Sequence, residues 1–242
     1  MTVPEKQHRV LVAVFVYNEG EKFRRTLQSI PEDRSFDVLV VNDGSTDGVE
    51  RIIEEFPFHA IHNATNRGLG YGFKRAIAFA REHGYEVFVP MAGNGKMTAA
   101  EVPIVVKPIL EEGYDYVQGS RYLPGARRDN LPVFRNAMIV TLARILTVVT
   151  QVKVTDSTCG FRAYRLSLFD DSRIDIFQDW LDRYELENYL MFKVLTLGYR
   201  YAEVPASMVY PAGDKNYSKI VPGLGWWSMV KPFVYLTLRV KD

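Results

Sequence analysis

The feature that most constrains this sequence is a regular alternation of short, continuous apolar runs with segments of helical periodicity. The runs Arg9–Val16, Asp37–Val41 and Glu86–Pro90 predict strands buried on both faces of a sheet. Apolar residues at helical spacing follow Glu21, and Gly68 begins a segment that reads as a helix to about His83. A further helix and a short strand are expected over Val49–Phe56 and Phe58–His62. Such alternation predicts an α/β fold with a mostly parallel sheet flanked by helices.

The second half of the chain is less regular but continues the same plan. It predicts one domain over residues 1–220, because no repeat, low-complexity tract or linker interrupts it. An amphipathic segment over 221–242 would then pack on the domain or on a membrane surface. The expected elements of the second half are helices over Glu101–Leu110, Val133–Thr150 and Glu185–Leu197 and strands over Tyr114–Gln118 and Tyr201–Val204.

Charge argues against one class of partner and suggests another. The chain has 30 Lys and Arg against 29 Asp and Glu, so its net charge of +1 gives no reason to expect nucleic acid. The charges are segregated, however: five arginines lie over 119–144 and five basic residues over 215–241, with one acidic residue in the first block and none in the second. Solvated helix faces explain many such runs. Two basic blocks in one chain nevertheless predict an anionic partner.

The expected location follows from the N-terminus and from the cysteine content. The chain does not open with the pattern of a secretory leader, and no uninterrupted apolar run reaches the ~18 residues that a membrane span needs. Its single cysteine, Cys159, cannot form a disulfide within the chain. These features predict a cytoplasmic protein. The basic block over 215–241 adds the expectation that it binds peripherally to the cytoplasmic face of a membrane.

Polar clusters follow each predicted strand of the first half. Ligands of parallel sheets bind beyond the carboxyl ends of the strands, so these clusters would meet at one edge. Each alone could be turn chemistry, but four at one edge predict a binding site. The clusters are Tyr17-Asn18-Glu19, the turn that begins at Asn42-Asp43, Asn66-Arg67, and Gly93-Asn94-Gly95-Lys96.

These motifs, in this order, resemble the amino half of family 2 glycosyltransferases with the GT-A fold. Later segments are similar to the branch of that family typified by dolichyl-phosphate mannosyltransferases, and the match spans about residues 9–220. The segments that carry this similarity are Gly119-Ser120-Arg121-Tyr122-Leu123-Pro124-Gly125, Asp156-Ser157-Thr158-Cys159-Gly160-Phe161-Arg162, Ala202-Glu203-Val204-Pro205 and Ser218-Lys219-Ile220.

The resemblance implies inverting transfer of a sugar from a nucleoside diphosphate to a polyprenyl phosphate. Arginines at the positions of Arg121 and Arg135 would hold the acceptor phosphate, because the guanidinium fork suits phosphate oxygens. Arg162 and Lys219 are further acceptor-side candidates. An ionised phosphate needs no general base. The expected donor-binding residues are Tyr17, Asn18, Glu19, Asp43, Asn66, Gly68, Asn94 and Lys96.

The segment 91–97 departs from the pattern of the family. Relatives place Asp-x-Asp here to hold a divalent cation on the donor diphosphate, whereas this chain has Ala92 and Asn94 at the carboxylate positions. Asn94 offers one neutral carbonyl oxygen, and hard cations prefer carboxylates. A Mg2+ or Mn2+ cofactor is therefore implied by the resemblance but disfavoured by the sequence. We expect Lys96 to replace part of the metal charge on the leaving group.

Two alternatives to a phosphate acceptor stay open at this stage. Transfer to a sugar hydroxyl would need a base, for which Asp156, Glu185 and Glu187 are candidates. The resemblance places Asp156 on the acceptor side, and Arg162 could orient it through an ion pair. The other alternative is a relative that binds nucleotide sugar without turnover.

The tail, with Trp227, Lys231 and Phe233, would suit a segment at a bilayer surface.

Overall fold

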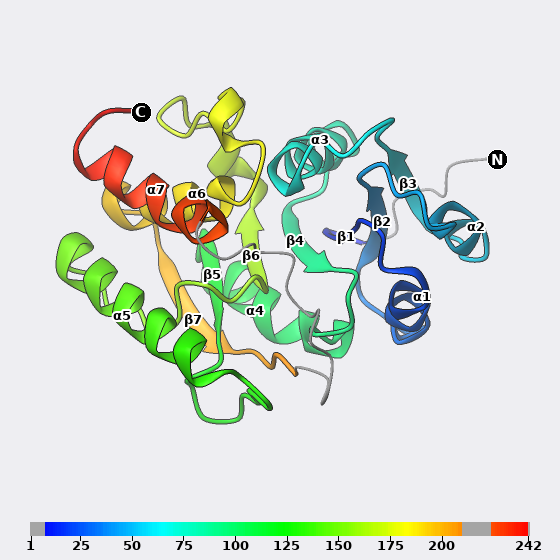
Figure 1. The fold of residues 1–242 in the computed structure, drawn as a ribbon, viewed down its shortest axis with the longest axis horizontal. Helices are drawn as coiled ribbons and strands as arrows, with labels where there is room; N and C mark the ends of the chain where they lie inside the picture. The colour runs from blue at the N-terminus through cyan, green and yellow to red at the C-terminus, as the bar shows by residue number, and fades with distance from the viewer. Residues whose placement is uncertain (1–7, 210–223, 242) are drawn as a thin grey trace.

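The computed structural model describes residues 8–209 and 224–241, and within the second range it describes side chains from Trp227 onward. A seven-stranded sheet in the order β3-β2-β1-β4-β6-β5-β7 forms the middle layer (Figure 1). Its strands are β1 (Val10–Val16), β2 (Asp37–Asn42), β3 (His59–His62), β4 (Val87–Ala92), β5 (Tyr116–Ser120), β6 (Arg162–Arg165) and β7 (Tyr201–Pro205). The α-helices are α1 (Gly20–Gln28), α2 (Val49–Glu54), α3 (Leu69–Glu82), α4 (Val102–Glu112), α5 (Val133–Thr150), α6 (Glu185–Leu197) and α7 (Leu224–Thr237).

The sheet is mostly parallel, as the apolar runs predict. β1 pairs in parallel with β2 and β4, β2 with β3, and β5 with β7. β6 is the exception, because it runs antiparallel to both β4 and β5. The sequence did not predict this strand: its residues, Arg-Ala-Tyr-Arg, do not form an apolar run, and its first arginine is buried.

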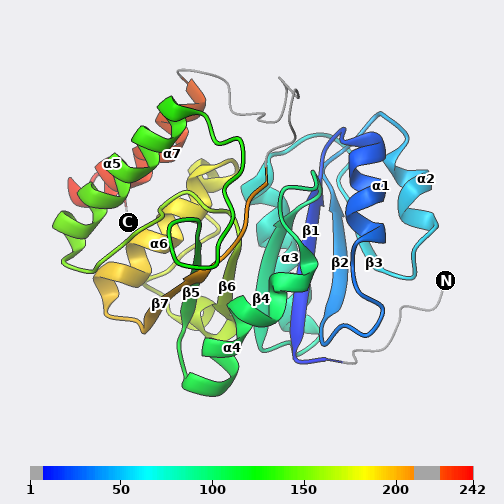
Figure 2. The ribbon, with the colours of Figure 1, turned by 90° about the horizontal axis from the view of Figure 1, so that it is seen from below.

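Side chains alternate between the two faces of the sheet and build a core on each. One core combines residues such as Leu11 and Ala13 with α3 and α6, and the other combines Val12 and Val14 with α1, α2 and α4. This alternation is the strand period of two expected for strands covered on both sides. Both views show the helices as two outer layers around the sheet (Figures 1 and 2).

Helices α5 and α7 lie at the end of the molecule opposite α1 and α2 (Figures 1 and 2). α7 packs against α6: Lys231 Nζ donates to Glu185 Oε1 at 2.6 Å, and Phe233 is buried. The sequence left open whether this segment packs on the domain or on a membrane surface. For Lys231 and Phe233 the structure shows contact with the domain.

Candidate active site

The carboxyl edge of the parallel strands gathers the predicted donor residues. The carboxylate of Asp43, just beyond β2, accepts hydrogen bonds from Asn63 Nδ2 at 2.8 Å and from the backbone N–H groups of Arg67 and Gly68, both at 2.9 Å. Asp43 therefore holds the 66–68 loop against the end of β2. Asn66 lies exposed within this loop.

Residues 17–19 form the neighbouring rim of the same edge. Asn18 adopts a positive φ of 50°, and its Oδ1 accepts the N–H of Thr46 at 2.8 Å, which joins the turn after β1 to the turn after β2. Tyr17 is exposed at 36%. Glu19 precedes α1 but makes no side-chain cap bond, so helix capping does not explain this carboxylate.

Gly68 is one of the expected donor-binding residues, and the structure shows that packing also requires a glycine there. A Cβ on Gly68 would meet Asp182 O at 2.5 Å, and one on Gly70 would meet Leu181 O at 1.9 Å. The N–H of Gly70 donates to Arg183 O at 3.1 Å. The start of α3 thus lies directly against the 181–183 segment of the chain. This close contact requires residues without a Cβ at positions 68 and 70.

The loop after β4 is fixed at both of its ends. Gly93 N–H donates to Phe15 O at 2.8 Å, and Lys96 O accepts the N–H of Val209 at 3.1 Å. Between them, Asn94 Oδ1 accepts the N–H of Lys96 at 3.3 Å. Asn94 thus shapes the turn from which the Lys96 side chain extends into an adjoining pocket.

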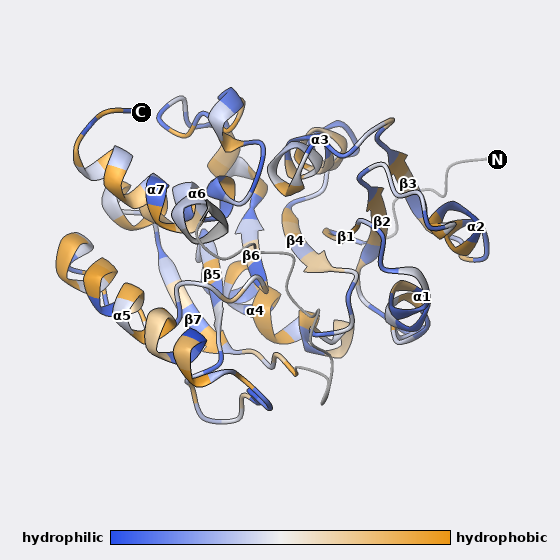
Figure 3. Ribbon diagram, in the orientation of Figure 1, coloured by the Kyte–Doolittle hydropathy of each residue, from blue (hydrophilic) through white to orange (hydrophobic). Residues whose placement is uncertain are grey.

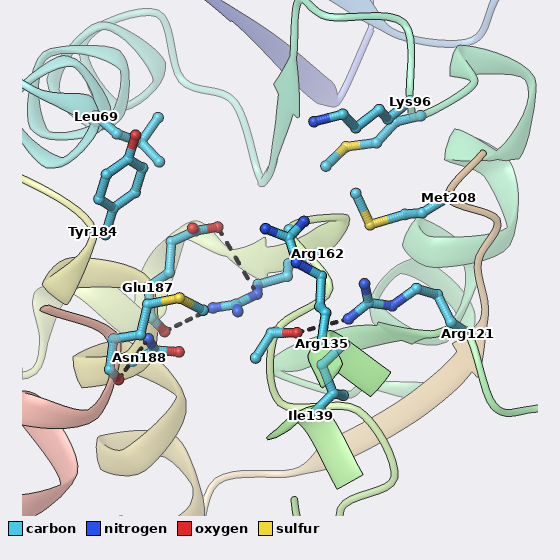
Figure 4. A pocket seen from close by; sticks show the side chains of 14 residues that line it. Leu69, Lys96, Arg121, Arg135, Ile139, Arg162, Tyr184, Glu187, Asn188 and Met208 are labelled. Atoms are coloured by element: carbon cyan, nitrogen blue, oxygen red, sulfur yellow. Dashed lines mark hydrogen bonds and ion pairs between the residues drawn. The ribbon is translucent and has the colours of Figure 1, made fainter. Parts of the chain in front are cut away.

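That pocket, which we call the cationic pocket, brings together side chains from distant parts of the sequence. Four of them are basic, and they come from the loop after β4, the end of β5, the start of α5 and β6. Figure 4 shows Lys96 and Arg135 extending into it from opposite sides. The lining residues are Leu69, Lys96, Met97, Arg121, Arg135, Ile139, Thr158, Gly160, Arg162, Tyr184, Glu187, Asn188, Met208 and Met229.

Arg121, which lines this pocket, forms a buried ion pair with Asp156. The Asp156 carboxylate, which is 0% exposed, accepts Arg121 Nε at 2.6 Å and Nη2 at 2.7 Å. It also accepts three backbone N–H groups, including that of Arg121 itself at 3.1 Å. Two expectations are corrected here: Arg121 and not Arg162 pairs with Asp156, and a carboxylate so fully hydrogen-bonded is unsuited to act as a base.

The segment that carries Asp156 is held by Glu203 of β7. The Glu203 carboxylate accepts the N–H groups of Thr155 and Asp156 at 2.8 and 3.2 Å and the Thr155 hydroxyl at 2.7 Å. Thr158 Oγ1 accepts Arg121 Nη2 at 2.7 Å. Sequence reasoning assigned no role to Glu203 or Thr158, although both lie within the segments that carry the resemblance.

Arg162 and Glu187 form the floor of the pocket beside this pair. The buried Arg162 guanidinium donates to the carbonyl oxygens of Cys159, Glu187 and Ser157 at 2.9, 2.7 and 3.2 Å. Glu187 Oε1 lies 3.9 Å from Arg162 Nε. Burial raises the pKa of Glu187 above its ordinary value, and the guanidinium opposes that rise in part.

The residues present do not fit a divalent cation at this edge. Ala92 and Asn94 stand where a carboxylate pair would be needed, and the described ranges 8–209 and 224–241 contain no group of three His, Cys, Asp or Glu side chains suited to a metal. Lys96, Arg135 and Arg162, with Arg121 already paired to Asp156, would also disfavour a metal ion electrostatically. The predicted acceptor residue Lys219 lies outside the described residues.

Comparison with known proteins identifies the family of this chain. The family described as "Glycosyl transferase family 2" matches residues 11–173, from β1 to beyond β6. The chain belongs to this family. The resemblance noted in its motifs is thereby confirmed, and the chain is a glycosyltransferase.

Relatives of this family 2 glycosyltransferase include enzymes named for lipid-phosphate acceptors. The undecaprenyl-phosphate mannosyltransferase of Micrococcus luteus is 30% identical over 210 residues, which cover 83% of this chain and 84% of the relative. Polyprenol monophosphomannose synthase of Mycolicibacterium smegmatis is 28% identical and is covered to 76%, with 81% of this chain. A UDP-N-acetylglucosamine--dolichyl-phosphate N-acetylglucosaminyltransferase of Methanococcus voltae is 22% identical, over 83% of this chain and 86% of that protein.

Solved structures confirm the GT-A fold of the domain. Glucosyl-3-phosphoglycerate synthase of Mycobacterium tuberculosis, crystallised with Mn2+, UDP and glucosyl-3-phosphoglycerate, superposes with a TM-score of 0.66 at 16% identity. The superposition covers 92% of this chain and 79% of that one. At this identity the likeness concerns the fold alone.

Proposed function

We propose that this family 2 glycosyltransferase moves a sugar from a nucleoside diphosphate to a polyprenyl phosphate. The observation that carries the proposal is the composition of the cationic pocket. Lys96, Arg121 and Arg135 offer charge to phosphate groups, while Met97, Ile139, Met208 and Met229 give the same pocket an apolar lining. A lipid phosphate has both an anionic head and a hydrocarbon chain, so its two parts match the two kinds of lining.

The acceptor phosphate would lie between Arg121 and Arg135. Arg135 would bind phosphate oxygens through paired N–H donors. Asp156 and Thr158 take the Nε and Nη2 donors of Arg121 and fix its orientation, so Arg121 would act on the phosphate mainly through its charge. Asp156 is then a positioning residue and takes no proton. The relatives named for undecaprenyl, polyprenol and dolichyl phosphates support this acceptor class.

The donor would lie along the carboxyl edge of β1, β2 and β4. Tyr17 and Glu19 form one rim of this edge, and the loop that Asp43 holds brings Asn66 to the other. We propose that these residues contact the nucleoside and that the diphosphate extends from them toward Asn94 and Lys96. The relative named for a UDP-N-acetylglucosamine donor supports a nucleoside-diphosphate donor, while Ala92 and Asn94 disfavour a metal ion.

The proposal is tested with the full chain, a panel of UDP and GDP sugars and a short-chain polyprenyl phosphate in detergent. Formation of a polyprenyl phosphosugar from at least one donor is the expected result, detected by mass spectrometry. A parallel reaction with a polyprenol that lacks the phosphate should give no product. Transfer to the polyprenol, or no transfer from any donor, would contradict the proposal.

One observation supports a second candidate, transfer to a sugar hydroxyl. Glu187 lies in the pocket, where its carboxylate could accept a hydroxyl proton, and burial raises its pKa. Loss of a general base usually lowers the rate by about 100-fold to 10,000-fold. Because an ionised phosphate acceptor needs no general base, we expect Glu187→Gln to keep most of the wild-type transfer to polyprenyl phosphate. A loss of about 100-fold to 10,000-fold in kcat would instead indicate that Glu187 acts as a general base, as a hydroxyl acceptor requires.

The same variant has an expected effect on stability. Because the folded pKa of Glu187 is raised, its protonated form favours folding, and that contribution is lost as pH rises above the ordinary value of 4.5 and through the folded pKa. Glu187→Gln should therefore melt at a higher temperature than the wild type at pH 7, and the difference should shrink below about pH 4.5. An equal difference at both pH values would contradict this assignment.

We further propose that α5 rests on the surface of the membrane that presents the acceptor. α5 is the one helix of the described residues that is long and apolar enough to span a membrane, and only 17% of it is buried. Its large exposed apolar residues share one side of the helix, on which Arg144 is exposed as well. Figure 3 shows the helix as mainly apolar. Buried Ile139 and Leu142 on its other side attach it to the domain, which favours a surface position. The exposed residues are Val133, Phe134, Ile145, Val148 and Val149.

Membrane contact by α5 predicts a loss of vesicle binding when a charge is placed on that side. Val148→Glu, at a residue 70% exposed, should weaken binding to phosphatidylcholine–phosphatidylglycerol vesicles by about ten-fold, because burial of such a side chain contributes ~1.5 kcal/mol or more. Ile104→Glu, on α4, is the matched control at 42% exposure and should bind like the wild type. Equal vesicle flotation of the two variants would contradict the proposal.

A further inference from the structure

The backbone of the turn that carries Lys96 is held in place by hydrogen bonds and close contacts. Besides its hydrogen bond to Phe15, Gly93 is confined sterically, because a Cβ there would meet Phe23 Cδ2 at 2.8 Å and Phe15 O at 2.9 Å. Val209 holds the other side of the turn through Lys96 O. Because the backbone of Lys96 is held in this way, only its side chain has to order when it meets a charge.

The position of Lys96 places it between the donor edge and the acceptor arginines. Its backbone follows β4, whose carboxyl end lies beside β1 at the donor edge, and its ammonium extends into the pocket that Arg135 also enters (Figure 4). Ala92 ends β4 with a methyl group, and the Asn94 amide oxygen is already used to shape the turn. The charge that this segment offers is thus a side-chain cation, with no carboxylate to hold a metal ion.

We propose that Lys96 stabilises the departing nucleoside diphosphate in place of a divalent cation, so that transfer proceeds without metal. This inference rests on the proposed nucleoside-diphosphate donor. It assigns the leaving-group role to one side chain, whereas Arg121 and Arg135 serve the acceptor.

The chemistry of the step requires such a charge. An acceptor phosphate oxygen forms a bond to the anomeric carbon while the bond from that carbon to the diphosphate oxygen breaks. The electron pair stays on the diphosphate, which leaves with one additional negative charge. No proton is transferred, because a phosphate monoester is largely ionised at neutral pH. The Lys96 ammonium would meet the new charge where it develops.

Binding in the presence of excess EDTA tests this role independently of the acceptor. Calorimetry would compare UDP with UMP and GDP with GMP, because the second phosphate is the group that Lys96 would contact. We expect the wild type to bind a nucleoside diphosphate about ten-fold or more tightly than the monophosphate, as for a hydrogen bond to a charged group. Lys96→Ala should lose that preference. A preference that appears only after Mn2+ or Mg2+ is added would overturn the proposal.

Three variants complete the test. Lys96→Gln removes the charge but keeps much of the stem, and it should lose the preference as Lys96→Ala does; Lys96→Arg should keep most of it. Lys107→Ala, at an exposed lysine of α4, is the control and should behave like the wild type. Retention of the preference in Lys96→Gln, with an unchanged melting temperature, would overturn the proposal even if Lys96→Ala fails to fold.

Turnover provides the second readout. In excess EDTA the wild type should keep its transfer rate, whereas Lys96→Gln should lose about 100-fold to 1,000-fold in kcat, the usual effect of removing a group that stabilises developing negative charge. Complete loss of wild-type turnover in EDTA, restored by Mn2+, would refute metal independence. Intact diphosphate binding without transfer to polyprenyl phosphate would instead count against the proposed acceptor.

Discussion

Replacing Arg135 by alanine is expected to lower kcat/KM for transfer to a short-chain polyprenyl phosphate by about 30-fold or more. Loss of one partner from a desolvated charge pair costs roughly 2–5 kcal/mol, and each 1.4 kcal/mol is a factor of ten. Arg135 enters the cationic pocket from the first turn of α5, where an acceptor phosphate would replace water around it. The affinity for the nucleoside diphosphate should change little, because the donor edge lies beyond Lys96.

Arg144→Ala is the matched control for this experiment. Arg144 lies on the same helix, is exposed, and does not line the pocket. In detergent, with a short-chain acceptor, it should keep the wild-type kcat/KM. If Arg135→Ala transfers as efficiently as Arg144→Ala, the acceptor phosphate does not bind where we place it. A parallel loss of diphosphate affinity in Arg135→Ala would place this arginine on the donor side.

The parallel half of the sheet could be predicted because one physical signal dominates it. β1, β2 and β4 are covered by helices on both faces, so their sequences are continuous apolar runs. The turns after them are polar because they must lie at the ligand-binding edge. From these two facts the fold class and the edge of the site follow without a structure.

β6 and the pairing of the buried arginines could not be predicted in this way. Arg162 has the sequence pattern of a surface residue, but three backbone carbonyls compensate the cost of burying its guanidinium. Periodicity does not reveal such compensation, since the three carbonyls belong to the 157–159 loop and to α6. For the same reason, the sequence alone did not indicate that Asp156 pairs with Arg121, which is 35 positions away, and not with Arg162.

The glycines at the start of α3 show a second limit. The resemblance placed Gly68 among the donor-binding residues, where a glycine would let the backbone approach a ligand closely. In the structure, the segment 181–183 occupies the space that a Cβ would fill on Gly68 or Gly70. Contacts between segments more than a hundred residues apart leave no local sequence signal, so a packing glycine and a binding glycine look alike.

Replacing Asp156 by alanine is expected to have the largest effect on stability, a loss of about 3–5 kcal/mol in the free energy of unfolding. Removing one partner of a buried ion pair leaves the other charge uncompensated, which is the origin of a cost of this size. Arg121 is 3% exposed, so water cannot replace the carboxylate, and the backbone N–H groups of Thr158 and Cys159 would lose their acceptor as well. Urea unfolding followed by circular dichroism measures the change.

Two further variants separate the buried charge from other effects of the substitution. Asp170→Ala removes a carboxylate from an exposed pair with Arg81 and should cost about 1 kcal/mol or less. Combining Asp156→Ala with Arg121→Met removes the uncompensated charge, so the double variant should be more stable than Asp156→Ala alone. It should nevertheless fail to transfer sugar to polyprenyl phosphate, because the arginine that would hold the acceptor is gone. A double variant no more stable than Asp156→Ala would show that the carboxylate stabilises the protein through the 156–159 turn and not by compensating the charge of Arg121.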